Sequence, residues 1–233
     1  MARIDGREND QLRPVEILPG INRFAEGSCL IRCGNTHVLC TASVEERTPP
    51  HVPEGEGWVT AEYSMLPRAN RERSRRDISK GKLSPRSAEI QRLVGRALRA
   101  AVDLKKLGAR TITIDCDVLQ GDGGTRTASV TGGFVALSYA CWKLVEEGVI
   151  PEMPITTCVA AVSAGIVDDV PMLDLCYEED SSAMVDLNCV MNHEGEIIEL
   201  QGTGEGRAFT IAEQRQLVDL CAKGIREIQA IQK

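Results

Sequence analysis

Aromatic side chains are scarce in this sequence: the 233 residues include two Trp, three Tyr and three Phe. A folded core must therefore be built mainly from Val, Ile, Leu and Ala. Apolar residues make up 42% of the chain, which is enough to bury one large domain or two small ones. With 26% charged residues, the composition also excludes a chain that is disordered throughout.

Segments with the pattern of a targeting or membrane-spanning sequence are also missing. Residues 1–10 are polar and charged and lack the apolar stretch of a signal peptide. The uncharged apolar run from Ile155 to Val167 has thirteen residues, which is too few to cross a bilayer. The nine Cys are odd in number and include no CxxC pair, which argues against a disulfide framework and against a zinc finger. We therefore expect a reduced, cytoplasmic protein.

Overall positive charge is absent too, and the net charge of −7 by itself argues against nucleic acid as a partner. The charge is unevenly distributed, however: residues 66–110 carry fourteen Lys or Arg against four Asp or Glu. That segment is +10, while the remaining chain is −17. Arg outnumbers Lys ten to four there, and the planar guanidinium suits phosphate. The segment indicates a polyanionic partner, with a solvated helix face as the alternative.

The apolar pattern predicts strands followed by long helices, twice over, and therefore an α+β fold of two similar halves. We place the halves at residues 1–150 and 151–233. The first half is expected to contain a hairpin over 27–44, a strand over 58–65, a basic loop over 67–83, a helix from 84 to 108, a strand over 111–119 and a helix over 128–147. The second is expected to contain strands over 155–167, 171–177, 183–191 and 197–201 and a helix over 211–232.

The sharpest local signal is Gly121-Asp-Gly-Gly-Thr-Arg-Thr127, between a predicted strand and a predicted helix. Its glycines let the backbone approach a ligand closely, and the first N–H groups of the helix point outward, as an anion site requires. Arg126 is opposed by the helix dipole, and a bound anion would offset that cost. The segment is neither a P-loop nor a dinucleotide fingerprint. A strand-to-helix turn without a ligand is the alternative.

Two further groups suggest chemistry. Arg86 follows Ser84-Pro85 at another predicted helix start, so the two arginines would form a cradle if the fold brings these helix starts together. Glu178-Glu-Asp180 and Asp186 lie at the tip and return of a predicted hairpin, where carboxylates could hold Mg²⁺ or act as a general acid. A solvated acidic turn is the alternative. The glycine-rich turn over 201–206 is a weak signal.

Motifs along the whole chain resemble the ribonuclease PH family in order and spacing. The matching segments are Gly27-Ser28, 57–68, 89–96, 115–120, 123–129, 179–181, 186–188 and 201–203. The resemblance implies a phosphate-dependent 3′→5′ exoribonuclease, a tRNA nucleotidyltransferase that trims tRNA precursors and releases nucleoside 5′-diphosphates. It also implies two tandem halves like the second domain of ribosomal protein S5, and a ring-shaped homohexamer built as a trimer of dimers.

The resemblance also assigns roles to residues. It gives phosphate binding to Arg86 and to the Gly124-Thr125-Arg126 motif, and catalysis or Mg²⁺ binding to Asp180 and Asp186. The arginines of the basic loop would then hold the RNA backbone: Arg68, Arg71, Arg73, Arg75 and Arg76.

The sequence departs from the family pattern in three places. Pro85 and Ser87 flank Arg86 where Gly and Thr are usual, and Gly121 stands where Ala is usual; both changes keep the functional side chains. Cys176 stands where an Asp is usual, which weakens the case for a metal site with three carboxylates.

Two rival functions compete with phosphorolysis. A catalytically silent, exosome-like RNA-binding ring subunit should have lost Arg86, Arg126 or one of the two aspartates, and this sequence keeps all four. A small-molecule kinase on an S5-like fold would need a nucleotide-binding loop, for which only the weak turn over 201–206 is available.

Overall fold

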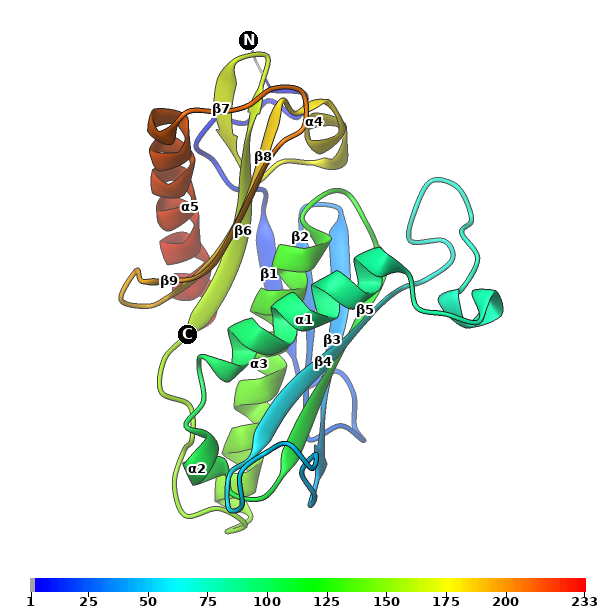
Figure 1. The fold of residues 1–233 in the computed structure, drawn as a ribbon, viewed down its shortest axis with the longest axis vertical. Helices are drawn as coiled ribbons and strands as arrows, with labels where there is room; N and C mark the ends of the chain where they lie inside the picture. The colour runs from blue at the N-terminus through cyan, green and yellow to red at the C-terminus, as the bar shows by residue number, and fades with distance from the viewer. Residues whose placement is uncertain (1–2) are drawn as a thin grey trace.

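The computed structural model describes residues 3–233, except for the side chains at 78 and 80. In its first half, a five-stranded sheet has the order β1-β2-β3-β5-β4. Neighbouring strands are antiparallel except β4 and β5, which are parallel and are connected through α1 (Figure 1). The elements are β1 (Val15–Pro19), β2 (Gly27–Cys33), β3 (Thr36–Glu45), β4 (Trp58–Met65), a 3₁₀ turn (Asp77–Lys80), α1 (Pro85–Arg99), α2 (Leu104–Leu107), β5 (Thr111–Gln120) and α3 (Thr125–Glu146).

The second half is a four-stranded antiparallel sheet in the order β7-β6-β8-β9, with α5 packed against it. Its elements are β6 (Val159–Val167), β7 (Val170–Leu173), α4 (Tyr177–Ser182), β8 (Val185–Asn192), β9 (Ile197–Gly204) and α5 (Ile211–Ile231). The α+β class is confirmed. The boundary at 150/151 stays a prediction, and the chain start crosses it, because Leu12 and Val15 pack on the core of the second half.

Helices α1 and α3 cover one face of the first sheet. Successive side chains of a strand point to opposite faces of the sheet, so one face of each strand can be apolar. On the covered face, register partners are Cys40 on β3, Cys116 on β5 and Tyr63 on β4, and all three are buried. The core is aliphatic, as the scarcity of aromatics requires. Helix α3 also contacts β6 of the second sheet. It is the one described helix long and apolar enough to span a membrane, but 72% of that stretch is buried inside the fold.

Two element predictions are wrong. The helix predicted to run to Gly108 ends at Arg99, and Asp103 then starts the short helix α2 by accepting hydrogen bonds from two backbone N–H groups. The strand predicted over 171–177 ends at Leu173, and the acidic residues form helix α4 rather than the tip of a hairpin. The chain turns at Asp174, whose φ of 53° is incompatible with a strand.

Gly27 on β2 lies directly against the backbone of α3, and a substitution there tests how that helix packs on the sheet. A Cβ at this position would collide with the backbone O of Ala136 and lie 2.7 Å from the N of Ala140, and helix backbone cannot yield. Gly27→Ala should therefore destabilise the fold by about 2 kcal/mol or more. The control is Gly95→Ala, whose Cβ would lie 3.2 Å from Nη1 of Arg99, a side-chain atom hydrogen-bonded to the Val59 carbonyl that must shift by only a few tenths of an ångström. The gain in helix propensity offsets that shift, so stability should change by less than about 1 kcal/mol. Equal melting temperatures for the two variants would contradict this.

Candidate active site

A pocket of about 330 Å³ lies where the starts of α1 and α3 meet α4 and β8. Six residues predicted to bind phosphate or to act in catalysis line it together: Arg86, Gly124, Thr125, Arg126, Asp180 and Asp186. The first half of the chain supplies the arginines and the glycine-rich turn, and the second half supplies the carboxylates. The cradle that the two helix starts were expected to form is therefore present.

The start of α3 forms one wall of the pocket and has the geometry of an anion site. Gly123 and Gly124 both have left-handed backbones, with φ of 72° and 64°, which glycine adopts without strain. Gly124 is the N-cap residue, and no side chain caps the helix. The first N–H groups of α3 therefore remain available to a ligand, and the positive end of the helix dipole faces the pocket.

Arg86 lies in the first turn of α1, behind an N-cap at Ser84 whose hydroxyl accepts the Ser87 N–H at 3.1 Å. Its side chain is exposed and makes no hydrogen bond or ion pair with any residue the structure describes. An arginine that makes no hydrogen bond or ion pair with the described residues, beside an uncapped helix start, is suited to bind an anion.

Arg126 is held in place by two residues that the sequence analysis did not single out. Its Nη1 donates to the Oε1 of Gln201 at 2.8 Å and to the Oε1 of Glu89 at 3.4 Å, and Gln201 itself donates to Glu89 at 2.9 Å. Both contacts use Nη1, so Nε and Nη2 remain for a ligand. Glu89 on α1 and Gln201 on β9 thus aim the guanidinium from both halves of the chain.

The two aspartates face the arginines across the pocket. Burial and the neighbouring charge of Asp180 raise the pKa of Asp186 to about 6, although Arg126 and a hydrogen bond from Asn188 at 2.9 Å act in the opposite direction. Desolvation within the pocket raises the pKa of Asp180 as well, even though its side chain reaches solvent and Arg86 partly offsets the shift. A carboxyl that keeps a proton near pH 6 is a suitable general acid.

Ser163 was also missed by sequence reasoning. It lies on β6, it is 4% exposed, and it lines the pocket. Its hydroxyl has no hydrogen-bond partner in the described part of the chain. No local pattern marks a serine in a buried strand, so only the folded chain identifies it.

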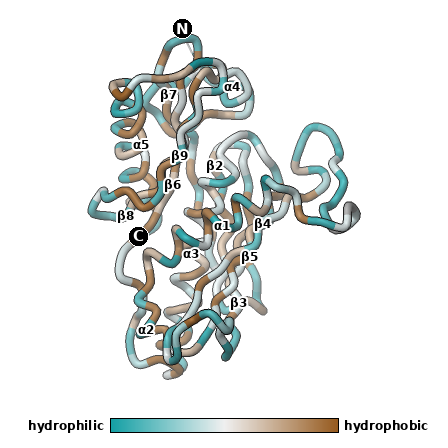
Figure 2. Tube along the Cα trace, viewed as in Figure 1, coloured by the Kyte–Doolittle hydropathy of each residue, from teal (hydrophilic) through white to brown (hydrophobic). Residues whose placement is uncertain are grey.

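The five arginines of the basic loop do not line this pocket. All are exposed, on a hydrophilic loop that projects from the body of the molecule (Figure 2). Arg71 reaches back to Glu178 on α4, at 2.8 Å. Arg76 lines a separate cavity of about 580 Å³ beside Asp115 and Asp117. The remaining three are Arg68, Arg73 and Arg75. An RNA-binding role for this loop stays a prediction.

A metal site with three protein ligands is not found: among residues 3–233, no three His, Cys, Asp or Glu side chains are grouped to hold an ion. Cys176, which stands where an Asp was expected, lies at the start of α4 and lines a neighbouring cavity with Arg13 and Asp122. Cys176 does not line the pocket of Asp180 and Asp186. The presence of Cys instead of Asp at this position therefore leaves both carboxylates in that pocket.

Comparison with solved structures supports the fold. The chain is similar to an archaeal exosome core structure, with a TM-score of 0.79 and 24% identity over 99% of this chain and 91% of the other. It is also similar to the Archaeoglobus fulgidus exosome with RNA bound to the active site, with a TM-score of 0.81 and 25% identity over 99% of this chain and 92% of the other.

Sequence comparison identifies the family. Residues 11–142 match domain 1 of the 3′ exoribonuclease family, and residues 157–223 match its domain 2. Ribonuclease PH of Syntrophomonas wolfei is 54% identical, over 100% of this chain and 98% of that protein. Ribonuclease PH of Bacillus pumilus is 56% identical, over 99% of this chain and 96% of that protein. This chain belongs to the 3′ exoribonuclease family, in which ribonuclease PH is found.

Proposed function

We propose that this chain is a phosphorolytic 3′→5′ exoribonuclease, a nucleotidyltransferase that uses inorganic phosphate as its co-substrate. The observation that carries the proposal is the pocket itself, in which an uncapped helix start and two arginines face two aspartates. Phosphate held at the arginine wall attacks the last phosphodiester of the RNA. The bond to the leaving 3′-oxygen breaks, so that a nucleoside 5′-diphosphate departs and the RNA keeps a 3′-hydroxyl.

Positive charge is the main catalytic requirement, because both reactants are anions. Arg86, Arg126 and the first N–H groups of α3 offset the repulsion between the phosphate and the phosphodiester and hold the two in line. No protein nucleophile is needed, since phosphate is the attacking group.

The carboxylates act on the leaving group. The raised pKa of Asp186 favours it as the donor of a proton to the departing 3′-oxygen. The two carboxylates also repel each other, and a bound cation would relieve that repulsion. Carboxylate oxygens are the ligand type that Mg²⁺ prefers. In the alternative role, with both carboxylates ionised, Asp180 and Asp186 would hold Mg²⁺, which would supply charge neutralisation at the scissile phosphate in place of a proton from Asp186.

The relatives also support a proposal for the assembly and the substrate. We propose that tRNA precursors are trimmed by a homohexamer, a trimer of dimers, in the cytoplasm. The high identity to proteins named ribonuclease PH supports the substrate, the similarity to exosome cores supports a ring, and nine free cysteines suit a reducing compartment. A catalytically silent ring subunit is less supported, because Arg86, Arg126, Asp180 and Asp186 are all present in one pocket.

Incubation with a 3′-extended RNA should release nucleoside diphosphates, and only when phosphate is added. Arg86→Ala should lower turnover by roughly 100-fold or more, because it removes a charge-assisted contact to the nucleophile. Arg215→Ala, near the start of α5 and outside the pocket, is the matched control and should leave turnover unchanged. Release of monophosphates at the same rate without phosphate would sink the proposal.

Asp186→Asn should make the protein more stable at high pH. The folded-state pKa of about 6 lies above the ordinary value of 3.8, so the ionised carboxylate destabilises the fold above pH 6 and not below about pH 4. The variant should gain on the order of 1 kcal/mol at pH 8, after allowance for solvent screening, and this gain should vanish on acidification to pH 4. Urea denaturation at both pH values measures it, and a constant difference would contradict the assignment.

Removing charge from the basic loop should weaken the binding of long RNA more than the cleavage of a short oligonucleotide. The variant changes Arg68, Arg73 and Arg75 to Gln, because Arg71 and Arg76 face acidic neighbours. Its log affinity should depend less steeply on log salt, by roughly 0.7 per lost single-strand phosphate contact. A triple variant of the exposed Arg23, Arg47 and Arg215 controls for net charge. Identical salt slopes for the parent and the loop variant would show that the loop is a solvated surface without contacts to RNA phosphates.

A further inference from the structure

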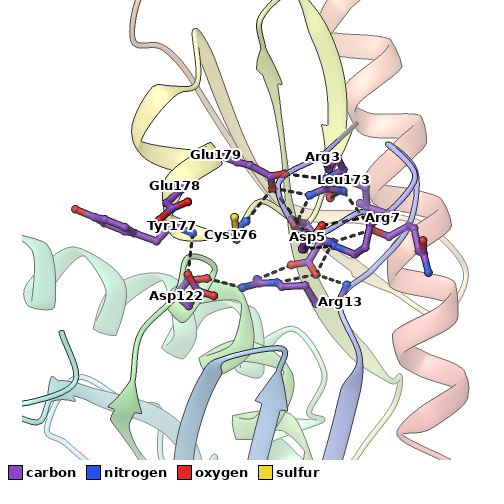
Figure 3. A network of polar contacts seen from close by, with 12 residues as sticks. Arg3, Asp5, Arg7, Arg13, Asp122, Leu173, Cys176, Tyr177, Glu178 and Glu179 are labelled. Atoms are coloured by element: carbon purple, nitrogen blue, oxygen red, sulfur yellow. Dashed lines mark hydrogen bonds and ion pairs between the residues drawn. The ribbon is translucent and has the colours of Figure 1, made fainter. Parts of the chain in front are cut away.

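The pocket depends on the alignment of two separate parts of the chain. Its anion-binding wall is the turn that leads into α3, in the first half, and its Asp180 lies on α4, in the second half. A short helix of six residues has little stability of its own, so contacts with its surroundings must fix where α4 lies. A dense network of polar contacts occupies that place (Figure 3).

Arg13 joins the two parts directly. Its backbone N–H and its Nε donate to Oδ2 of Asp174 at 2.8 and 3.0 Å, and its Nη2 donates to Oδ1 at 2.7 Å. The remaining guanidinium nitrogen, Nη1, donates to the backbone carbonyl of Asp122. Asp174 is in the turn before α4, and Asp122 is in the turn before α3. One planar side chain, 5% exposed, therefore bridges both turns (Figure 3).

The side chain of Asp122 makes a second connection. Its Oδ1 accepts the backbone N–H of Tyr177, the first residue of α4, at 3.2 Å, and its Oδ2 accepts from Asn35 at 3.3 Å. Its own N–H donates to the hydroxyl of Thr36 at 2.9 Å, and that hydroxyl donates to the carbonyl of Gly123 at 2.6 Å. The turn before α3 is thus fixed to the first sheet on one side and to α4 on the other.

A third connection lies on the far side of α4. Glu179, next to Asp180, accepts from Nε and Nη2 of Arg3 at 2.9 and 2.6 Å, and both side chains are almost fully buried. Burial raises the pKa of Glu179, but the hydrogen bonds from Arg3 and from the Cys176 N–H outweigh it and lower the pKa. The pair fixes α4 against the N-terminal segment.

We propose that Arg13, Asp122 and Asp174 are positioning residues, which set the distance between Asp180 on α4 and the phosphate-binding turn. None of the three touches the pocket that holds the reactants, so each acts through the elements it connects. The inference rests on the proposed phosphorolysis, since it assigns these residues to the alignment of phosphate with Asp180. Misplacement of a reacting group by about 1 Å is enough to lower turnover on the order of 100-fold.

The position of the phosphate site gives this role a specific kinetic signature. The groups that would bind phosphate lie on α1 and on the start of α3, both in the first half. Loosening α4 should therefore lower kcat while leaving KM for phosphate within about twofold, since KM here reports on groups that have not moved. A merely structural role would also leave KM unchanged, but it would lower kcat only in proportion to the folded fraction. The fall in kcat of each variant should therefore exceed the loss of folded protein measured by circular dichroism on the same sample.

Asp122 provides the cleanest variants because it is only partly buried. Asp122→Ala removes the acceptor for the Tyr177 N–H and should lower kcat about tenfold. Asp122→Asn keeps an oxygen in that place and should restore most of the turnover. Arg13→Lys keeps the charge beside Asp174 but loses the fork that reaches both turns, so it should lower kcat on the order of 10- to 100-fold.

A matched control breaks a different ion pair between the halves. Arg96 on α1 donates to both carboxylate oxygens of Glu199 on β9, at 3.1 and 2.6 Å, and neither residue lines the pocket. Glu199→Gln should leave kcat and KM unchanged. An equal fall in kcat for Glu199→Gln and Asp122→Ala would overturn the proposal. Turnover would then depend on any contact between the halves and not specifically on the contacts of Arg13, Asp122 and Asp174.

Amide hydrogen exchange tests the same inference without RNA. Asp122→Ala and Arg13→Lys should raise exchange over residues 177–182 of α4, and Glu199→Gln should not. Unchanged exchange in that segment would overturn the proposal, as would faster exchange there with an unchanged kcat. If the parent protein releases no nucleoside diphosphate with phosphate, the proposed function fails, while exchange still reports whether the connection exists.

Discussion

Direct backbone contact between the two halves of the chain, at Gly123, is the constraint on which the site depends. A Cβ there would lie 2.5 Å from the carbonyl O of Leu175 and 3.0 Å from the N of Tyr177. Only glycine permits that approach, and its φ of 72° is also one that other residues rarely adopt. With side chains excluded from the contact, the start of α3 and the start of α4 come close enough to share one pocket.

Buried charge then fixes what the backbone contact allows. Desolvating Arg3, Arg13, Asp174 and Glu179 is costly, and their pairing offsets that cost without a large net gain in stability. What paired and fully hydrogen-bonded charges provide is a single geometry, because any shift leaves a buried charge unsatisfied. The proposed reaction brings two anions and a proton together in this pocket, and it needs such a defined geometry more than extra stability.

Features fixed by residues close together in the sequence were predicted, whereas features fixed by contacts between distant residues were not. Ser84-Pro85 and the glycines before Thr125 are local signals, so the first helix start was found directly and the second, predicted at 128, within three residues of Thr125. The turn at Asp174 was missed because it is held by Arg13, which is 161 residues away. Glu89, Gln201 and Ser163 were missed as contributors to the site for the same reason, since their contacts with it exist only after folding.

The sequence separation of these contacts has a consequence for protein synthesis. Arg3 and its partner Glu179 are 176 residues apart, so the second half must emerge from the ribosome before the N-terminal segment finds its place. A nascent chain that ends before Asp180 has the turn before α3 and the basic loop but neither aspartate. Until translation passes those positions, the growing polypeptide next to the ribosome's own RNA lacks the two carboxylates of the proposed active site. The order of synthesis thus delays assembly of the complete pocket until residues 180 and 186 have been made.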